Sequence, residues 1–281
     1  MSRVLLTGAS GFIGSQARAA LAERGHEVHA ERVDLLAPGT AEELVRSVRP
    51  THLLHLAWYA VPGKFWTAPE NEAWVEATLR LLRAFYAAGG ERAVGAGTCA
   101  EYDWSEAGVL SEATTPLRPE TLYGQAKGET FAAASELGEL AWGRIFFLYG
   151  PGEHPDRLVS SVARRLLAGE EAPTTRGTQV RDFMHVADVA GAFAALVDSD
   201  VTGAVNVGSG VPVTVRAVVD EIARAAGRPE LLRPGALPQR EGEPATLVAD
   251  AGRLRAEVGF TPRYDLERGI EDTVAWWRKR V

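Results

Sequence analysis

TGASGFIG, residues 7–14, joins the short apolar run VLLT at 4–7 to a helical pattern over 12–24. Its three glycines have the spacing GxxGxxG. Glycines at this spacing allow a tight turn in which backbone N–H groups approach a pyrophosphate and the N-terminus of the helix points at it. The stretch therefore predicts a strand–turn–helix unit that binds a dinucleotide. The expected contacts come from Gly8, Ser10, Gly11, Phe12, Ile13 and Gly14.

Short apolar runs alternate with longer helical patterns through the first half of the chain. Such alternation is typical of parallel strands joined by crossover helices, so we expect an α/β fold with a doubly wound parallel sheet. The apolar residues of each helical pattern recur at the spacing of one helix face. The expected strands are 4–7, 27–31, 52–57, 92–97 and 142–149, and the expected helices are 12–24, 40–48, 70–89 and 123–138.

The Gly/Pro turn at 149–152 interrupts this alternation and marks the main domain boundary. After it we expect a helix near 157–168, then a return to the sheet through a strand at 182–186, a helix at 187–198 and a strand at 204–208. The proline-containing remainder and a final helix from about 265 would form a small lid. We therefore predict a dinucleotide-binding domain from 1–151 with 177–220, and an interleaved substrate domain from 152–176 with 221–281.

The composition of the chain limits the classes of partner that we expect for it. Its 281 residues include 46% hydrophobic and 24% charged residues, with a net charge of -7. A negative net charge argues against nucleic acid as a partner, and no apolar run is long enough to predict a membrane span. The first strand begins directly after Arg3, which leaves no room for a signal peptide, and Cys99 is a lone cysteine, so a reducing cytoplasm is expected. The six histidines lack the spacing of a metal site.

The end of the second expected strand decides the cofactor. Glu31 could accept a hydrogen bond from a ribose 2′-hydroxyl, as in NAD(H), whereas Arg32 could pair with a 2′-phosphate, as in NADP(H). Arg32 lies at the better distance along the chain, so NADP(H) is favoured and NAD(H) stays open. Asp34, which precedes Leu35, is a candidate for the adenine amino group or for a turn before the next helix.

Tyr123 and Lys127, in the stretch ETLYGQAK at 120–127, lie one helical turn apart and share one face of the expected helix. A free phenol has a pKa near 10, so its use as a base near neutral pH requires that pKa to fall by roughly three pH units. A neighbouring ammonium acts in that direction. Lys127 could also hold ribose hydroxyls, and Thr98, at the end of the fourth expected strand, offers a hydroxyl to the substrate.

Several motifs together resemble one family. TGASGFIG, HLA at 55–57, TCAEYD at 98–103, YGQAK at 123–127, YGPG at 149–152 and RDFMHVADVA at 181–190 are similar to the extended short-chain dehydrogenase/reductases of the NAD-dependent epimerase/dehydratase type, which act on nucleotide sugars. The resemblance implies a Rossmann fold, a catalytic triad of Thr98, Tyr123 and Lys127, and a homodimer formed through the helices at 70–89 and 123–138. It implies cofactor contacts from Leu35, Leu56 and Ala57.

The resemblance further implies that Arg181, Asn206 and Arg240 face a nucleotide diphosphate. Arginine suits that task because its guanidinium is permanently charged and forked. Two alternatives stay open: Arg181 could instead pair with Asp182 or Asp188, and Asn206 could cap a turn.

Departures from the family pattern bear on the reaction. Cys99 and Ala100 stand where 4,6-dehydratases carry an Asp-Glu pair, which argues against dehydration. Phe147 stands where epimerases often carry Asn, which indicates a changed substrate pocket. With Arg32 and the compact length, this favours a 4-ketoreductase of an NDP-4-keto-6-deoxyhexose; an NDP-sugar 4-epimerase with bound NAD is the alternative. A non-catalytic dinucleotide sensor is a second alternative, disfavoured because both Tyr123 and Lys127 are present.

The segment WYAVPGKFW at 58–66 follows the third expected strand and is dense in aromatic residues. It could form a sugar-binding wall, a lid over the base, or a packed loop.

Overall fold

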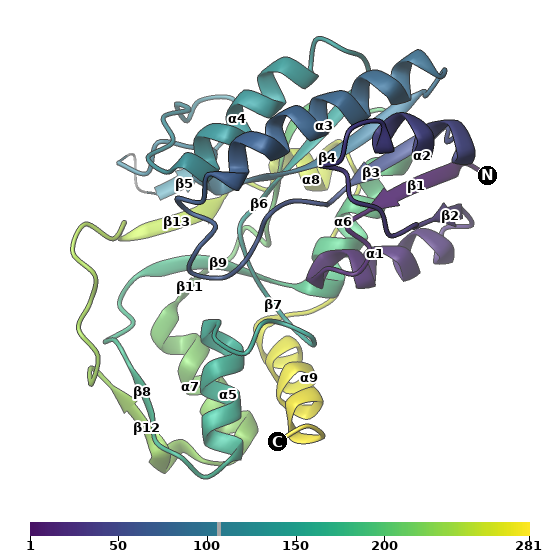
Figure 1. Cartoon of the computed structure of the whole chain (residues 1–281). Helices are drawn as coiled ribbons and strands as arrows, with labels where there is room; N and C mark the ends of the chain where they lie inside the picture. The colour runs from purple at the N-terminus through teal and green to yellow at the C-terminus, as the bar shows by residue number, and fades with distance from the viewer. Residues whose placement is uncertain (106–107) are drawn as a thin grey trace.

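The computed structural model describes residues 1–105 and 108–281. Its main sheet is parallel throughout, with the order β10-β6-β4-β3-β1-β2 (Figure 1). This arrangement confirms the predicted α/β fold with a doubly wound parallel sheet. The strands are β1 (Arg3–Thr7), β2 (Glu27–His29), β3 (His52–His55), β4 (Arg92–Thr98), β6 (Leu140–Ile145) and β10 (Gly203–Val207).

Helices cover both faces of the main sheet, and each face has its own hydrophobic core. One core packs the sheet against α1 (Phe12–Glu23) and α6 (Val186–Asp198). The other packs it against α2 (Thr40–Val48), α3 (Glu70–Ala87) and α4 (Leu122–Ala134). Strands that are buried on both faces consist of continuous apolar runs. β1 and β3 could therefore be predicted from the sequence.

A second sheet lies beside the first, with the order β11-β9-β13-β5 and with β7 paired to β9. The predicted return of residues 182–186 to the main sheet is wrong, because β9 belongs to this second sheet. The run 142–149 also divides, since β6 ends at Ile145 and β7 leaves the main sheet. An apolar run predicts a buried strand but does not say which sheet buries it. The strands are β5 (Gly108–Leu110), β7 (Phe147–Tyr149), β9 (Val180–His185), β11 (Pro212–Thr214) and β13 (Thr246–Ala249).

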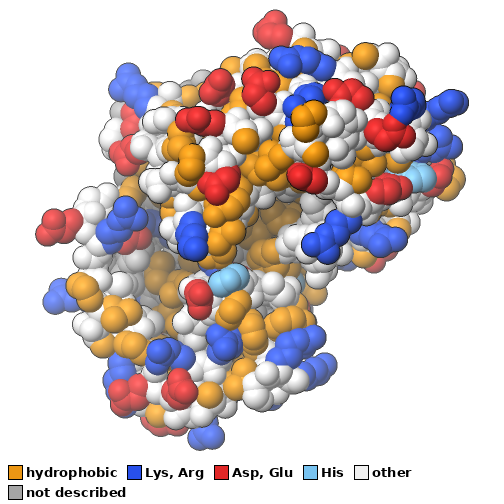
Figure 2. Space-filling view, in the orientation of Figure 1, with side chains coloured by type: hydrophobic (Ala, Val, Ile, Leu, Met, Phe, Trp, Pro, Cys, Tyr) orange, Lys and Arg blue, Asp and Glu red, His pale blue; other side chains and the backbone are white. Residues whose placement is uncertain are grey.

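A third core joins three helices below the second sheet (Figure 1). The predicted range 177–220 therefore mixes elements from both parts of the molecule: β10 and α6 belong with the main sheet, whereas β9, β11 and α7 do not. Figure 2 shows a hollow between the two parts in which hydrophobic side chains gather. The helices of this part are α5 (Leu158–Leu167), α7 (Val215–Ala226) and α9 (Leu266–Arg278), with β8 (Ala172–Thr174) and β12 (Leu232–Pro234) as a two-stranded sheet; α8 (Gly252–Ala256) follows β13.

Candidate active site

The glycine-rich turn lies between β1 and α1, as expected. Gly8 has φ +75°, and a Cβ placed there would lie 2.6 Å from the backbone nitrogen of Ala57. A Cβ on Gly14 would collide with the carbonyl of Gly8. The turn is therefore packed against the segment after β3 so closely that only glycine fits. Within the described residues α1 has no side-chain cap and no acidic residue in its first turn, so its N-terminal N–H groups suit an anion such as a pyrophosphate.

Strand β2 ends at His29, two residues before the predicted end at 31, so Glu31 and Arg32 follow the strand. Glu31 and Arg32 are exposed, and the Glu31 carboxylate lies 3.5 Å from Nδ1 of His29. The Asp34 carboxylate accepts a hydrogen bond from the Leu36 N–H at 3.0 Å, so its side chain forms a turn. Arg80 on α3 donates to the carbonyl of Leu35 at 3.0 Å. These contacts support the turn role of Asp34, while the predicted contacts of Glu31, Arg32, Asp34 and Leu35 with a cofactor stay predictions.

Thr98, Tyr123 and Lys127 come together where β4 ends and α4 begins. The Thr121 hydroxyl caps α4 by accepting the N–H of Gly124 at 3.1 Å. Gly124 contacts the backbone of Ala100 so closely that no Cβ fits. This contact seats the first turn of α4 on the end of β4.

The environment of the triad has opposing effects on Tyr123. Burial raises the pKa of its phenol well above the ordinary value, while hydrogen bonding by Thr98 lowers it. Nζ of Lys127 donates to the Ala96 carbonyl at 2.7 Å, and burial lowers the pKa of this ammonium to about 7. An ammonium has three N–H donors, and Ala96 takes one of them. Lys127 can therefore still hold the hydroxyls of a ribose.

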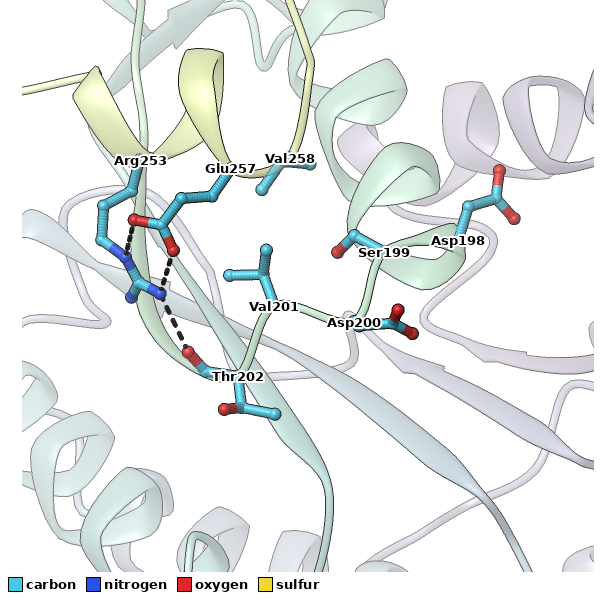
Figure 3. A pocket seen from close by; sticks show the side chains of 8 residues that line it. All are labelled: Asp198, Ser199, Asp200, Val201, Thr202, Arg253, Glu257 and Val258. Atoms are coloured by element: carbon cyan, nitrogen blue, oxygen red, sulfur yellow. Dashed lines mark hydrogen bonds and ion pairs between the residues drawn. The ribbon is translucent and has the colours of Figure 1, made fainter.

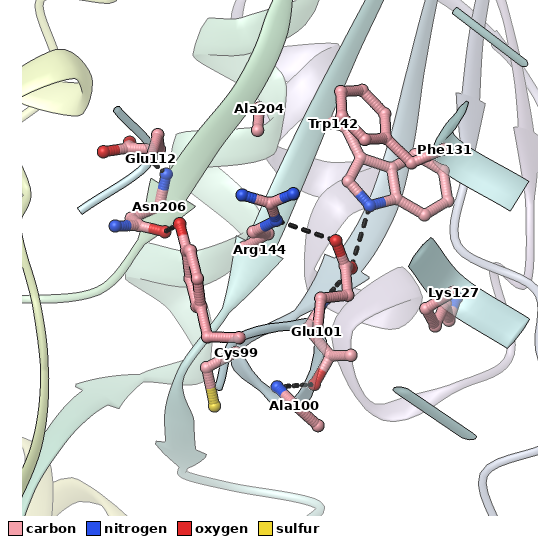
Figure 4. A network of polar contacts seen from close by, with 12 residues as sticks. Cys99, Ala100, Glu101, Glu112, Lys127, Phe131, Trp142, Arg144, Ala204 and Asn206 are labelled. Carbon is pink, nitrogen blue, oxygen red and sulfur yellow. Dashed lines mark hydrogen bonds and ion pairs between the residues drawn. The ribbon is translucent and has the colours of Figure 1, made fainter. Parts of the chain in front are cut away.

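Sequence reasoning missed a buried network beneath the triad, drawn in Figure 4. The Glu101 carboxylate is 0% exposed and accepts hydrogen bonds from the Thr98 N–H at 2.8 Å, the Trp142 indole at 2.9 Å and the Arg144 guanidinium at 2.7 Å. Trp142 and Arg144 lie on β6, and Arg144 is in register with Gly97 of β4. The spacing Thr98-x-x-Glu101 is that of a capping box and could have predicted the bond to Thr98. Trp142 and Arg144 lie about forty residues later in the chain, and no signal in the sequence joined them to Glu101.

The aromatic segment after β3 packs on the candidate catalytic tyrosine. The rings of Phe65 and Trp66 lie 4.8 and 5.9 Å from the Tyr123 ring. The backbone N–H of Tyr123 donates to the Trp66 carbonyl at 3.1 Å. The segment is thus part of the wall around Tyr123, and sequence alone could not choose among its possible roles.

Of the predicted substrate residues, Arg181 lies near Phe147. Arg181 on β9 is buried, and its partner is Glu243 at 2.8 Å rather than Asp182 or Asp188. Its guanidinium lies 5.4 Å from the ring of Phe147.

Asn206 is fully buried elsewhere. It accepts from the Tyr102 hydroxyl at 2.7 Å and donates to the Leu110 carbonyl at 2.8 Å. Arg240 is exposed in the segment before β13. The contacts of Phe147, Arg181, Asn206 and Arg240 with a substrate stay predictions.

A pocket of about 580 Å³ lies away from the triad, at the amino end of β10 (Figure 3). Arg253 and Glu257 form an ion pair in its wall at 2.8 Å. The triad lies at the opposite, carboxyl end of the strands, so this pocket is not part of the candidate site. It is lined by Asp198, Ser199, Asp200, Val201, Thr202, Arg253, Glu257 and Val258.

Residues 1–105 and 108–281 offer neither a metal-binding cluster nor a membrane-spanning helix. No group of three or more His, Cys, Asp or Glu side chains in these ranges could hold a metal ion. No helix within them has the length and apolar character needed to span a bilayer.

Known proteins match this chain over nearly its whole length. UDP-glucose 4-epimerase from Corynebacterium glutamicum is 31% identical over an alignment of 317 positions, which covers 98% of this chain and 94% of the relative. The structure of UDP-glucose 4-epimerase from Thermus thermophilus in complex with NAD is similar, with a TM-score of 0.88, 30% identity, and 99% and 100% of the two chains covered. MoeE5 in complex with UDP-glucuronic acid and NAD has a TM-score of 0.84 and 32% identity, with 99% and 100% covered.

The model of the NAD-dependent epimerase/dehydratase family matches residues 4–208. This range includes the glycine-rich turn and the Thr98, Tyr123 and Lys127 cluster. This chain belongs to the NAD-dependent epimerase/dehydratase family.

Proposed function

We propose that this protein interconverts the C4 epimers of a nucleotide sugar and uses NAD. The observation that carries the proposal is the full-length similarity to UDP-glucose 4-epimerases combined with an intact Thr98, Tyr123 and Lys127 cluster. The glycine-rich turn and the uncapped N-terminus of α1 fit the pyrophosphate of a dinucleotide. A UDP-sugar is the proposed substrate class.

The 4-ketoreductase, which the sequence favoured, receives no specific support from these relatives. That interpretation rested on Arg32, Phe147 and the compact length. The relatives solved with a dinucleotide hold NAD, and exposed Glu31 offers a carboxylate suited to a ribose 2′-hydroxyl. We therefore propose NAD rather than NADP(H) as the cofactor.

The residues of the site have distinct tasks in this proposal. The nicotinamide of NAD would supply oxidation of C4 to a ketone and its reduction from the opposite face of that carbon, which inverts C4. The Tyr123 phenolate takes the proton from the sugar hydroxyl, and the resulting phenol gives it back to the same oxygen, with the Thr98 hydroxyl beside it. Because burial raises the pKa of Tyr123, ionisation of the phenol depends on Thr98 and on positive charge from Lys127 and the nicotinamide ring. The Lys127 ammonium also orients the ribose through its remaining donors.

Binding of the substrate diphosphate requires a change in one ion pair. Arg181 is bound to Glu243, so a diphosphate that uses Arg181 must displace or share that carboxylate. Arg240, three residues before Glu243, would then be close enough in the chain to add a second positive charge. A homodimer through α3 and α4 also remains a proposal, supported by the family resemblance.

Mass spectrometry of the native protein, followed by incubation with UDP-glucose and no added cofactor, tests the function. We expect bound NAD and the appearance of UDP-galactose without net cofactor turnover. Tyr123→Phe should lower the rate by about 10²–10⁴-fold, the usual range for loss of a general acid–base group. Tyr264→Phe removes a phenol outside the Thr98, Tyr123 and Lys127 cluster and should leave the rate within about twofold.

Other outcomes would contradict the epimerase. Oxidation of NADPH with an NDP-4-keto-6-deoxyhexose, without epimerisation of UDP-sugars, would identify the reductase. Binding of a dinucleotide without turnover of any nucleotide sugar would identify a sensor. Failure to bind any dinucleotide would contradict all three functions.

A further inference from the structure

Trp58 contacts the ammonium of Lys127. Nζ of Lys127 lies 3.7 Å from the centroid of the Trp58 ring. A cation within about 6 Å of the face of an indole ring is attracted by its negative face, most strongly when both are desolvated. Lys127 is 3% exposed. The Trp58 ring thus occupies part of the shell that water would otherwise fill around this ammonium.

Asn71 fixes the Trp58 ring from the other side. The Trp58 indole N–H donates to Oδ1 of Asn71 at 2.8 Å. The Asn71 amide donates in turn to the carbonyls of Phe65 and Ala68, both at 2.8 Å. Asn71 is 0% exposed, so each of these hydrogen bonds forms away from water. One side chain on the first turn of α3 therefore ties together three points of the segment between β3 and α3.

The same segment also holds Tyr123. Trp66 accepts the backbone N–H of Tyr123, and the Phe65 and Trp66 rings meet the Tyr123 ring edge to face. Both members of the Tyr123 and Lys127 pair therefore contact one segment, Trp58 at its start and Phe65 and Trp66 near its end. α4 alone provides the spacing of the pair but does not restrict the rotamer of a long lysine side chain.

We propose that residues 58–68, fastened by Asn71, form a positioning clamp for Tyr123 and Lys127, with Trp58 holding the Lys127 ammonium in the site. The catalytic consequence of the clamp rests on the proposed function, but its structural part does not. Trp58 and Asn71 are positioning residues, since both act through Lys127. The clamp reduces the entropy lost when Lys127 engages a ribose, because the ammonium is already placed.

Lysine labelling provides a direct test, because the chain has only three lysines, Lys64, Lys127 and Lys279. Lys64 and Lys279 are exposed. Acylation consumes the neutral amine in equilibrium with the ammonium, and burial lowers the pKa of Lys127, so protonation would slow the reaction of this lysine no more than that of an ordinary one. Slow labelling of Lys127 would therefore report coverage rather than protonation.

The experiment compares the full-length wild type with Trp58→Leu, Trp58→Phe and Trp276→Leu at matched NAD content, so that differences in labelling report the side chain and not the cofactor. We expect Trp58→Leu to speed the labelling of Lys127 about tenfold relative to Lys279, and to lower kcat of the epimerisation by a similar factor. Trp58→Phe retains a ring over the ammonium and should recover much of the protection. Trp276→Leu removes a tryptophan from α9 and should change neither quantity.

Two results would overturn the clamp. One is labelling of Lys127 in the wild type as fast as that of Lys279; the other is unchanged Lys127 labelling in a Trp58→Leu protein that melts like the wild type. If Trp58→Leu fails to fold, Trp58→Met, which keeps more of the side-chain volume but has no ring, takes its place in the comparison, and unchanged Lys127 labelling in that variant would overturn the clamp. A wild type with protected Lys127 but no epimerase activity would contradict the proposed function and leave the clamp supported.

Discussion

At the scale of single residues, Glu101 is a charge placed in the protein interior beneath the candidate catalytic residues. Burying a carboxylate away from water raises the free energy of the folded protein unless its oxygens accept hydrogen bonds. One oxygen of Glu101 accepts from Thr98 and Trp142, and the other accepts from Arg144. The bond to the Thr98 backbone fixes the end of β4, which carries the Thr98 hydroxyl. The stability of this network and the geometry of the site are therefore linked.

Glu101→Gln should destabilise the protein strongly. The amide oxygen can still accept from Thr98 and Trp142, but Arg144, at 2% exposure, loses its counter-ion. Removal of one partner from a buried pair costs about 3–5 kcal/mol of unfolding free energy, which urea denaturation would measure. The double variant Glu101→Gln/Arg144→Met should recover much of that loss, because no buried charge remains. Equal losses in the single and double variants would show that the charge pair is not the cause.

At the scale of elements, the start of α5 depends on a carboxyl group that lies outside the helix. Glu153, in the turn after β7, accepts from the Ser160 N–H at 3.1 Å and from its hydroxyl at 2.8 Å. The same Ser160 hydroxyl accepts from the Trp277 indole of α9 at 3.1 Å. Burial raises the pKa of Glu153 to about 7, although the Ser160 hydrogen bond acts in the opposite direction.

This raised pKa predicts a pH dependence of stability. Between pH 4.5 and about 7 the folded protein holds the Glu153 proton and the unfolded chain releases it, so stability falls as pH rises through that window and then levels off. Glu153→Gln mimics the protonated acid and should be more stable than the wild type above pH 7, by on the order of 3 kcal/mol at most. Below pH 4.5 the two proteins should be similar. Urea unfolding at several pH values measures the stability of both proteins below pH 4.5 and above pH 7.

Asp156→Asn is the matched control, because Asp156 lies in the same turn with its side chain 81% exposed. It should retain the wild-type pH dependence. A Glu153→Gln protein with the wild-type slope would contradict the assignment of this dependence to Glu153.

At the scale of the whole molecule, Asp182 joins the main sheet to the second sheet. Its carboxylate lies on β9 and accepts from the Ser209 N–H at 2.7 Å, the Gly210 N–H at 2.8 Å and the Ala249 N–H at 3.1 Å. Residues 209–210 lie in the connection that follows β10 of the main sheet, and Ala249 ends β13. One carboxylate thus fixes the connection between the two sheets.

Asp182→Asn should weaken this junction. An amide has one accepting oxygen, and its NH₂ group would face backbone N–H donors that then lack an acceptor. We expect a loss of about 2–4 kcal/mol in unfolding free energy, with faster hydrogen exchange at residues 209–210 and in β13. The control Asp220→Asn changes an exposed pair with Arg216 on α7 and should cost under about 1 kcal/mol. Unchanged exchange at these backbone amides would contradict the role of Asp182.

The sequence was sufficient to predict features that depend on residues close together in the chain. Helix α2 was predicted at its observed bounds, because its apolar spacing is periodic. The Tyr123 and Lys127 pair was predicted from i, i+4 spacing, which a helix converts directly into a shared face. The sheet of β9 and the partner of Arg181 were not predictable, since each depends on segments distant in the chain that approach only after folding.

By itself, the sequence determined the glycine-rich turn, the parallel main sheet and the Tyr123 and Lys127 pair, because these follow from glycine spacing, strand–helix alternation and helical periodicity within short windows. Only the tertiary structure decided what surrounds the triad. Glu101 meets Arg144 through the register of β4 and β6, and Trp58 meets Lys127 through the folding of residues 58–68 onto α4. Such contacts depend on three-dimensional packing between segments whose separation in the chain carries no periodic signal.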